Sequence, residues 1–173
     1  INKKSGKSFQ TLITEAFVKL TDVQLKNPEM KKLLTDESFN FDLCFIESWV
    51  EPMFPMKDRF NCSLILISSL TGSMSNFDAF GNPSNPTLFT DAFSPYFGHL
   101  DFWQRLEVTI KNIRDRYAYY LHDVPTYDAF TKTVFGSNTR SVSEIQNDAD
   151  MIFINGHPIL SGIRPVVPGI VYL

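Results

Sequence analysis

Glu47 is the residue of this sequence best placed to do acid–base chemistry. It directly follows the apolar run 41–46, whose length and flanks predict a strand buried on both faces of a sheet. A carboxylate at the end of such a strand can act as a general base, or it can orient a histidine base by accepting its other ring N–H. The structural alternative is a glutamate at a helix N-terminus, where it interacts favourably with the helix dipole.

Other candidate positions follow from the geometry of open parallel sheets. Ligands of open parallel sheets bind outside the carboxyl ends of the strands, which selects the segments 47–49, 68–72 and 155–157 and the chain after Leu173. His157 lies in the third of these segments. A lone histidine in a turn is more often structural or solvated than catalytic, and we expect that of His157.

Several classes of site and partner are disfavoured. His99 and His122 are isolated, and no His-x-x-x-His or Cys-x-x-Cys pattern exists, so we expect no metal site. The chain has no Gly-x-Gly-x-x-Gly or P-loop motif, hence no recognisable phosphate cradle. Its net charge of −3 comes without a basic face, which argues against a nucleic-acid partner. Cys44 and Cys62 lie in or beside apolar runs and are expected to be buried free thiols.

Strands and helices alternate along the chain, which predicts an α/β fold with a partial Rossmann-like, mostly parallel sheet. The unit from 41 to 67 reads as strand, helix, strand and implies a right-handed crossover. Apolar runs predict strands at 41–46, 63–67, 151–154 and 170–173, and apolar spacings of three and four predict helices at 8–26, 28–34, 51–59, 101–121, 125–134 and 141–147.

A long segment, 68–100, has no predicted helix or strand and is rich in Ser, Asn, Gly, Pro and Phe. Its many aromatic side chains argue against disorder, so we expect an ordered loop that lines a pocket. The helix that follows carries an apolar stripe, with Asp101 as its N-cap. The stripe consists of Phe102, Leu106, Ile110, Ile113 and Tyr117.

The length of 173 residues suggests one domain. The sequence contains no run of about 18 apolar residues, no initiator methionine and no signal peptide. It ends on the apolar run 170–173, which is typical of a chain that continues into more protein. We therefore expect residues 1–173 to be a single, partial domain.

Four segments, in their order and spacing, resemble the animal UDP-glycosyltransferases, which include the UDP-glucuronosyltransferases of vertebrates and the UDP-glucosyltransferases of insects and insect viruses. The resemblance is weak before residue 40 and firm from there to Leu173, and Gly-Asn-Pro at 81–83 is most similar to insect members. The segments are Phe-Asp-Leu at 41–43 followed by Glu47, Phe60-Asn61 before an apolar strand, Asp-Phe-Trp-Gln-Arg-Leu at 101–106, and 150–158 followed by Arg164-Pro165.

This resemblance implies the second part of the N-terminal, acceptor-binding half of a GT-B fold, in which two Rossmann-like halves face each other. The family's base is a histidine near the mature N-terminus, outside this chain, and the acidic residue at the Glu47 position orients it. The acceptor hydroxyl then attacks the anomeric carbon of a UDP-sugar with inversion. Vertebrate members carry aspartate here, so glutamate adds one methylene. No cofactor is implied, because the UDP-sugar is a co-substrate.

The resemblance also implies partners and a location. The parent protein would use a UDP-sugar donor, glucose or glucuronic acid, and a small lipophilic acceptor. It would lie on the lumenal side of the endoplasmic reticulum membrane with an anchor downstream of this chain, or be secreted if it comes from an insect virus. The segment alone, without the base histidine and the UDP-binding C-terminal half, is expected to be inactive.

Aromatic and sulfur-containing side chains near Glu47 and in the long loop are the expected lining of the acceptor pocket. Ser68 and Ser69 are the candidates for donor contact. The alternative to an enzyme is a non-catalytic α/β module that binds an apolar ligand or a protein partner. The expected lining residues are Trp49, Met53, Phe54, Phe77, Phe80 and Phe93.

Overall fold

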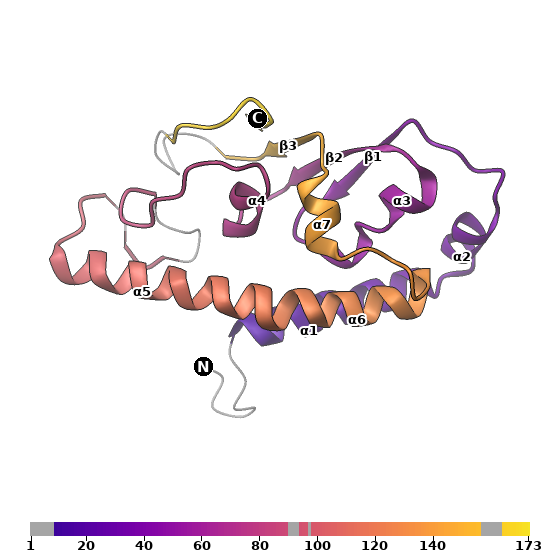
Figure 1. The fold of residues 1–173 in the computed structure, drawn as a ribbon, viewed down its shortest axis with the longest axis horizontal. Coiled ribbons are helices and arrows are strands. Elements are labelled where there is room, and N and C mark those ends of the chain that lie inside the picture. The colour runs from indigo at the N-terminus through magenta and orange to yellow at the C-terminus, as the bar shows by residue number, and fades with distance from the viewer. Residues whose placement is uncertain (1–8, 90–93, 97, 157–163) are drawn as a thin grey trace.

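A four-stranded, fully parallel sheet is the centre of the molecule (Figure 1). The structure is a computed structural model that describes residues 9–89, 94–96, 98–156 and 164–173. The strands lie in chain order and are β1 (Leu43–Glu47), β2 (Ser63–Ser68), β3 (Met151–Ile154) and β4 (Ile170–Tyr172). The predicted α/β fold with a partial Rossmann-like sheet is confirmed.

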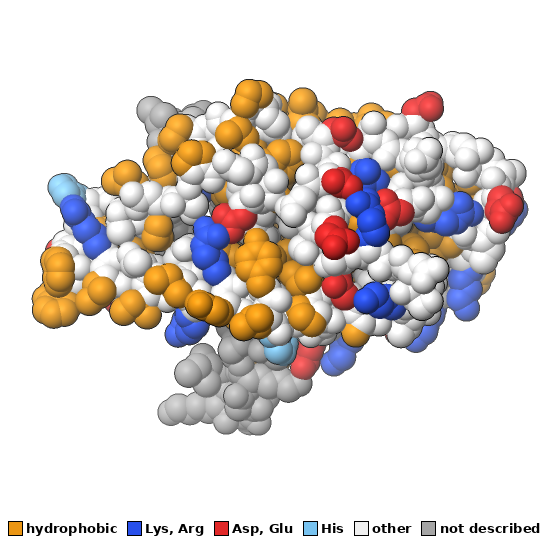
Figure 2. Space-filling view, in the orientation of Figure 1, with side chains coloured by type: hydrophobic (Ala, Val, Ile, Leu, Met, Phe, Trp, Pro, Cys, Tyr) orange, Lys and Arg blue, Asp and Glu red, His pale blue; other side chains and the backbone are white. Residues whose placement is uncertain are grey.

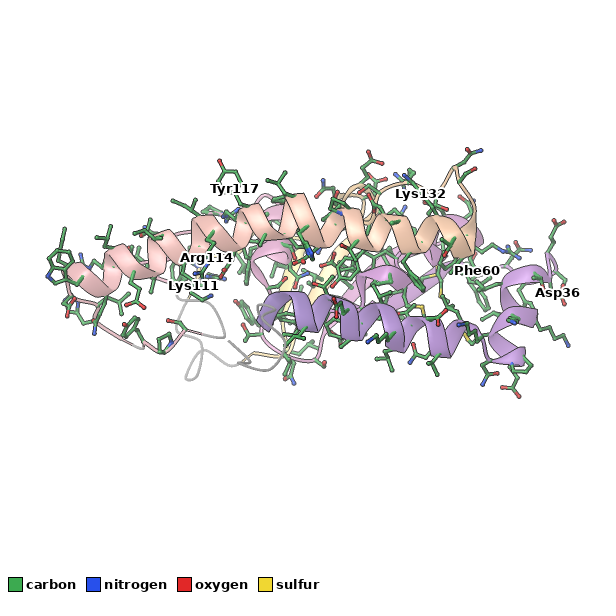
Figure 3. The ribbon with its side chains drawn as sticks, turned by 90° about the horizontal axis from the view of Figure 1, so that it is seen from below. Asp36, Phe60, Lys111, Arg114, Tyr117 and Lys132 are labelled. Atoms are coloured by element: carbon green, nitrogen blue, oxygen red, sulfur yellow. A yellow bond between two sulfur atoms is a disulfide. The ribbon has the colours of Figure 1, made fainter. Side chains whose placement is uncertain are left out.

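Helices pack around this sheet, and along the chain they lie between its strands. A short 3-10 turn, η1 (Glu51–Met53), lies between β1 and α3 and packs against both α1 and α6. Figure 3 shows α1 running alongside α6. The helices are α1 (Phe9–Leu25), α2 (Pro28–Thr35), α3 (Met56–Phe60), α4 (Met74–Ala79), α5 (Phe102–Ala118), α6 (Val124–Phe135) and α7 (Val142–Asn147).

The helices α5 and α6 are joined end to end, where the sequence predicts two separate helices. A π-helical segment, η2 (Tyr119–Asp123), connects them, and together they form the long rod beneath the sheet in Figure 1. Pro125 lies in the first turn of α6. Proline has no N–H to donate and normally breaks a helix. The wider π turn changes the hydrogen-bonding pattern at that point, so the rod continues past the proline.

The strand β1 is more exposed than expected, because the sequence predicts burial on both faces. Leu43 is 43% exposed and Phe45 54% exposed, whereas Ile46 belongs to the core. Leu43 and Phe45 point to the face of the sheet opposite Ile46, where Ile65 and Ile67 of β2 are also only partly buried, so the described part of the chain covers this face of the sheet incompletely. The core itself forms around β2 and β3, whose Leu64, Leu66, Ile152 and Ile154 are fully buried.

Cys44 and Cys62 form a disulfide, so the prediction of free thiols is wrong. Cys44 is on β1, opposite Leu64 of β2, and Cys62 directly precedes β2. The parallel crossover through α3 therefore returns the chain to a position beside Cys44, and the two Cα atoms lie 5.9 Å apart. A separation of 18 residues in the sequence does not indicate that the two cysteines are close in space. Their proximity follows only from the strand register.

Loss of this disulfide should destabilise the fold substantially. Replacing both Cys44 and Cys62 by alanine is expected to lower the free energy of unfolding by about 3 kcal/mol, because the bond closes a loop of 18 residues in the unfolded chain. Urea unfolding followed by circular dichroism measures the change. A reducing agent should shift the wild type and leave the double variant unchanged; equal midpoints for wild type and variant without reductant would contradict the prediction.

The long loop contains the helix α4, which the sequence analysis missed, and is anchored by a buried side chain. Asn82 is 5% exposed. Its Oδ1 accepts the backbone N–H of Val167 at 2.9 Å, and its Nδ2 donates to the carbonyl of Pro165 at 3.2 Å. These bonds fasten the loop to the segment that leads into β4. The expectation of an ordered loop is therefore confirmed for its described part.

Removal of that anchor gives a second stability prediction. Asn82→Ala is expected to lower the free energy of unfolding by about 1–3 kcal/mol, because it removes the acceptor of the partly buried N–H of Val167. Asn85→Ala is the matched control, since the bonds that the Asn85 side chain accepts from described residues are local ones from Thr87. Differential scanning calorimetry should show a clear drop in melting temperature for the first variant and a small one for the second. Equal drops would refute an anchoring role for Asn82.

The predicted apolar stripe of α5 lies at the surface. Phe102, Leu106, Ile110, Ile113 and Tyr117 are between 42% and 70% exposed, and hydrophobic side chains line this edge of the molecule in Figure 2. Thus the stripe is not used to pack α5 on the sheet. In the part of the chain that the structure describes, no helix is both long and apolar enough to cross a membrane.

Candidate functional site

Glu47 is the last residue of β1 and pairs in register with Ile67 of β2. Its carboxylate accepts the backbone N–H of Ser69, with distances of 3.1 Å to Oε2 and 3.3 Å to Oε1. This bond is to the chain beyond β2 and not to the first turn of η1. The carboxylate is therefore held at the carboxyl ends of two neighbouring parallel strands, where ligands of such sheets bind.

A mainly apolar hollow of about 290 Å³ lies beside this carboxylate, and we call it the Glu47 hollow. One wall comes from α1 and the other from the chain that follows β1 and β2. Of the described residues that line it, Glu47 is the one with an ionisable side chain. The lining residues are Ile13, Ala16, Phe17, Glu47, Trp49, Val50, Ser69 and Leu70.

Trp49 is held in the wall of this hollow by a side-chain hydrogen bond. Its indole Nε1 donates to Ser68 Oγ at 3.1 Å, and that hydroxyl donates in turn to the carbonyl of Thr71. Ser68 is fully buried, so its hydroxyl serves these internal contacts. Ser69, the other residue predicted to contact a donor, is exposed and lines the Glu47 hollow.

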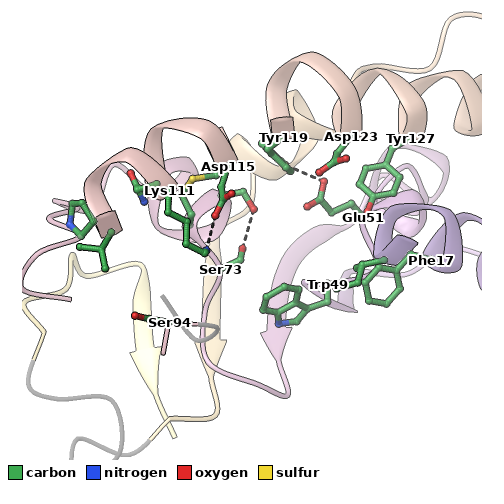
Figure 4. A pocket seen from close by; sticks show the side chains of 16 residues that line it. Phe17, Trp49, Glu51, Ser73, Ser94, Lys111, Asp115, Tyr119, Asp123 and Tyr127 are labelled. Atoms are coloured by element: carbon green, nitrogen blue, oxygen red, sulfur yellow. Dashed lines mark hydrogen bonds and ion pairs between the residues drawn. The ribbon is translucent and has the colours of Figure 1, made fainter. Parts of the chain in front are cut away.

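A second hollow, of about 100 Å³, adjoins the first and is called the Glu51 hollow (Figure 4). The two hollows share Ile13, Phe17 and Trp49 as lining. The long loop contributes to the second hollow, as the sequence predicts for that segment. Its other lining residues are Glu51, Ser73, Met74, Ser75, Pro86, Ser94, Val108, Lys111, Asn112, Asp115, Tyr119, Asp123 and Tyr127.

Glu51 is the most unusual ionisable group of this region. It is 7% exposed because η1 packs between α1 and α6. Burial raises the pKa of Glu51 to about 8; a hydrogen bond with Tyr119 opposes the rise, and the negative charges of Asp123 and Asp128 add to it. This raised pKa favours the protonated, uncharged form of the Glu51 carboxyl at neutral pH.

Tyr119 connects Glu51 to a further buried side chain. The Tyr119 hydroxyl lies 2.9 Å from Glu51 Oε2 and 3.2 Å from Gln146 Oε1. Burial and the neighbouring Glu51 raise the pKa of Tyr119 well above its usual value. Burial likewise raises the pKa of Tyr127, which lines the same hollow. Glu51, Tyr119 and Tyr127 thus favour protonated forms at neutral pH, and the same hollow is also lined by the ionisable side chains of Lys111, Asp115 and Asp123.

Glu51 is not among the site residues predicted from the sequence. In the sequence it is the first residue of a predicted helix, beside Pro52. Its burial depends on Tyr119, which is 68 residues further along the chain. A glutamate next to proline and within an otherwise apolar stretch was the one available signal, and it does not reveal the packing of η1 against α1 and α6.

The residues predicted to line an acceptor pocket fall into three groups. Trp49 lines both hollows. Phe54 and Phe77 are buried in the core, and Met53 and Phe80 pack against it, so that these four line neither hollow. Phe93 lies outside the described residues, and so does His157, which the sequence predicts to be structural or solvated. Among the described residues, no group of three or more His, Cys, Asp or Glu side chains is arranged to hold a metal ion.

Comparison with known proteins gives a consistent set of relatives. The chain is 27% identical over 157 residues to the ecdysteroid UDP-glucosyltransferase of Spodoptera littoralis nuclear polyhedrosis virus, covering 90% of this chain and 30% of that protein. It is 25% identical over 161 residues to the ecdysteroid UDP-glucosyltransferase of Lymantria dispar multicapsid nuclear polyhedrosis virus, covering 92% and 32%. A UDP-glycosyltransferase UGT5 of Dactylopius coccus is 30% identical over 95 residues, covering 54% and 18%.

No family model matches the chain, and no solved structure matches it significantly. The chain spans about a third of the length of the viral relatives. Within that span the match covers nine-tenths or more of this sequence, 90% and 92% for the two viral proteins. The resemblance to the UDP-glycosyltransferases that the sequence motifs predict is thereby confirmed, with the viral and insect proteins as its relatives.

Proposed function

We propose that the whole protein is an inverting UDP-glycosyltransferase of the GT-B fold, and that this chain supplies part of its acceptor-binding half. The observation that carries the proposal is Glu47, held at the carboxyl ends of β1 and β2 in the wall of an apolar hollow. Sequence similarity to proteins named UDP-glucosyltransferases supports the same reaction class.

In the proposed mechanism Glu47 orients the base and does not itself take the acceptor proton. The N–H of Ser69 fixes the carboxylate, which accepts a ring N–H from a histidine outside this chain. The other ring nitrogen removes the proton of the acceptor hydroxyl. That oxygen forms a bond to the anomeric carbon from the side opposite UDP, and UDP leaves with the electron pair of the broken bond. The carboxylate also stabilises the imidazolium that results.

The acceptor class follows from the lining of the Glu47 hollow. Apolar side chains from α1 and from the chain after β1 suit a small lipophilic alcohol. The names of the relatives favour glucose as the transferred hexose and steroid-sized acceptors. In this proposal, other parts of the whole protein bind UDP and hold the membrane anchor. This chain alone should therefore not catalyse the transfer.

The disulfide supports a secretory route for the protein. Disulfides persist mainly in oxidising compartments such as the lumen of the endoplasmic reticulum and the extracellular space. Both the lumenal side of the endoplasmic reticulum membrane and the extracellular space are oxidising compartments of this kind.

A transfer assay tests the proposed function. The whole protein is incubated with UDP-glucose or UDP-glucuronic acid and a set of lipophilic alcohols, and the glycoside and free UDP are measured. Formation of both products by the wild type, and their loss in Glu47→Ala, are expected. Binding of apolar ligands without any release of UDP would instead indicate a non-catalytic module, and full activity of Glu47→Ala would refute the role of Glu47.

A further inference from the structure

The Glu51 hollow contains a polar group that the proposed reaction does not use. The hollow adjoins the Glu47 hollow, and Trp49 stands in the wall of both. A ligand whose reacting hydroxyl lies near Glu47 can therefore extend past Trp49 towards Glu51. Which hydrogen bonds that end of the ligand can form depends on where the protons of Glu51 and of its neighbours lie.

Counting protons shows which atom of Glu51 is left for a ligand. Gln146 Oε1 is an amide oxygen and can only accept, and the Tyr119 hydroxyl 3.2 Å away has a single proton to donate. If that proton goes to Gln146, the 2.9 Å contact between Tyr119 and Glu51 Oε2 needs a proton from Glu51 itself. The protonated state of Glu51 supplies it. Two protons then satisfy the Tyr119 hydroxyl, Gln146 Oε1 and Glu51 Oε2, whereas the buried Nε2 of Gln146 has no hydrogen-bond partner among the described residues.

The second carboxyl oxygen of Glu51 has no hydrogen-bond partner in the part of the chain that the structure describes. Among the residues that the structure describes, Tyr119 is the one that forms a hydrogen bond with this carboxyl. Glu51 is more than nine-tenths buried, yet its side chain lines the hollow (Figure 4). In the relay described above, Oε1 is a neutral, carbonyl-type acceptor. A buried acceptor of this kind discriminates strongly in favour of a ligand that brings a proton donor.

We infer that Glu51 is a specificity-determining residue that accepts a hydrogen bond from a second hydroxyl of the acceptor, remote from the hydroxyl that receives the sugar. This inference rests on the proposed function and narrows its substrate class to lipophilic alcohols with two separated hydroxyl groups. Trp49 and Phe17 would contact the apolar skeleton between them. Glu51 takes no part in the chemical step.

The test compares a rigid lipophilic diol with the mono-alcohol that lacks the remote hydroxyl, using the whole protein and UDP-glucose. For the wild type, the KM of the diol is expected to be roughly 10-fold lower, with similar kcat values. Glu51→Leu should raise the KM of the diol roughly 10-fold and leave that of the mono-alcohol unchanged. Glu51→Gln should retain the preference, because its amide keeps a carbonyl oxygen for the ligand and an N–H for Tyr119.

Each outcome of this test either supports or overturns the role of Glu51. Equal KM values for the two alcohols in the wild type would overturn the inference, and they would do so even if Glu51→Leu failed to fold. Equal losses for both alcohols in Glu51→Leu would show a merely structural role and would also overturn it. Failure of the wild type to transfer glucose to any alcohol would refute the proposed function itself, which distinguishes the two failures.

Discussion

Exchange of Glu47 for glutamine is expected to lower kcat of the whole protein by about 10²–10⁴-fold, with a small change in the KM of the acceptor. Glutamine keeps the size of the side chain and can still accept the N–H of Ser69 through its amide oxygen. It lacks the negative charge that stabilises a protonated histidine. The loss should therefore appear in the chemical step and not in the binding of an alcohol to the apolar hollow.

Two further variants make this prediction specific. Glu47→Asp keeps the charge but shortens the side chain by one methylene, so an intermediate kcat is expected, between those of the wild type and of Glu47→Gln. Glu37→Gln is the matched control, because Glu37 is exposed and lines neither hollow. Steady-state kinetics at saturating UDP-glucose measure all three. A Glu47→Gln variant with the kcat of the control would contradict an orienting role for Glu47.

The position of Glu47 could be predicted because it depends on short-range patterns. Apolar runs of four to six residues define β1, β2 and β3, and their alternation with helices implies parallel pairing. In a parallel sheet all carboxyl ends lie at one edge. A residue at the end of one strand and the chain after the next strand must then be neighbours, as Glu47 and Ser69 are.

Features that depend on long-range packing could not be predicted in the same way. The disulfide requires the register of β1 on β2, and the sequence does not state which residues of two apolar strands are opposite each other. The burial of Glu51 requires η1 to lie between α1 and α6, and its partner Tyr119 belongs to a π-helical segment that no periodicity indicates. The helix α4 is hidden because its cap residues, Ser73 and Asn76, are typical of loops.

The protonated state assigned to Glu51 has a direct consequence for the pH dependence of stability. Its ordinary pKa of 4.5 applies to the unfolded chain, and the folded value is about 8. Between these values the folded protein keeps a proton that the unfolded chain has lost, so the folded state binds more protons and stability falls as pH rises. The contribution is fully present below pH 4.5 and is lost by about pH 8. Tyr119 and Tyr127 stay protonated throughout, because burial raises their pKa values above the ordinary 10.

Glu51→Gln should remove this pH dependence while keeping the size and the hydrogen-bonding capacity of the side chain. Since a tenfold change in proton affinity corresponds to about 1.4 kcal/mol, the difference between wild type and variant can change by up to roughly 5 kcal/mol between pH 4.5 and pH 8. At pH 8 the variant is expected to be the more stable protein, and at pH 4.5 the two should be similar. Urea unfolding at four pH values in this window measures the difference, with Glu37→Gln as the control for loss of an exposed carboxylate. Parallel stability curves for wild type and Glu51→Gln would mean that Glu51 is ionised in the folded protein at neutral pH. The proton relay through Tyr119 to Gln146 would then be refuted as well, because it depends on that proton.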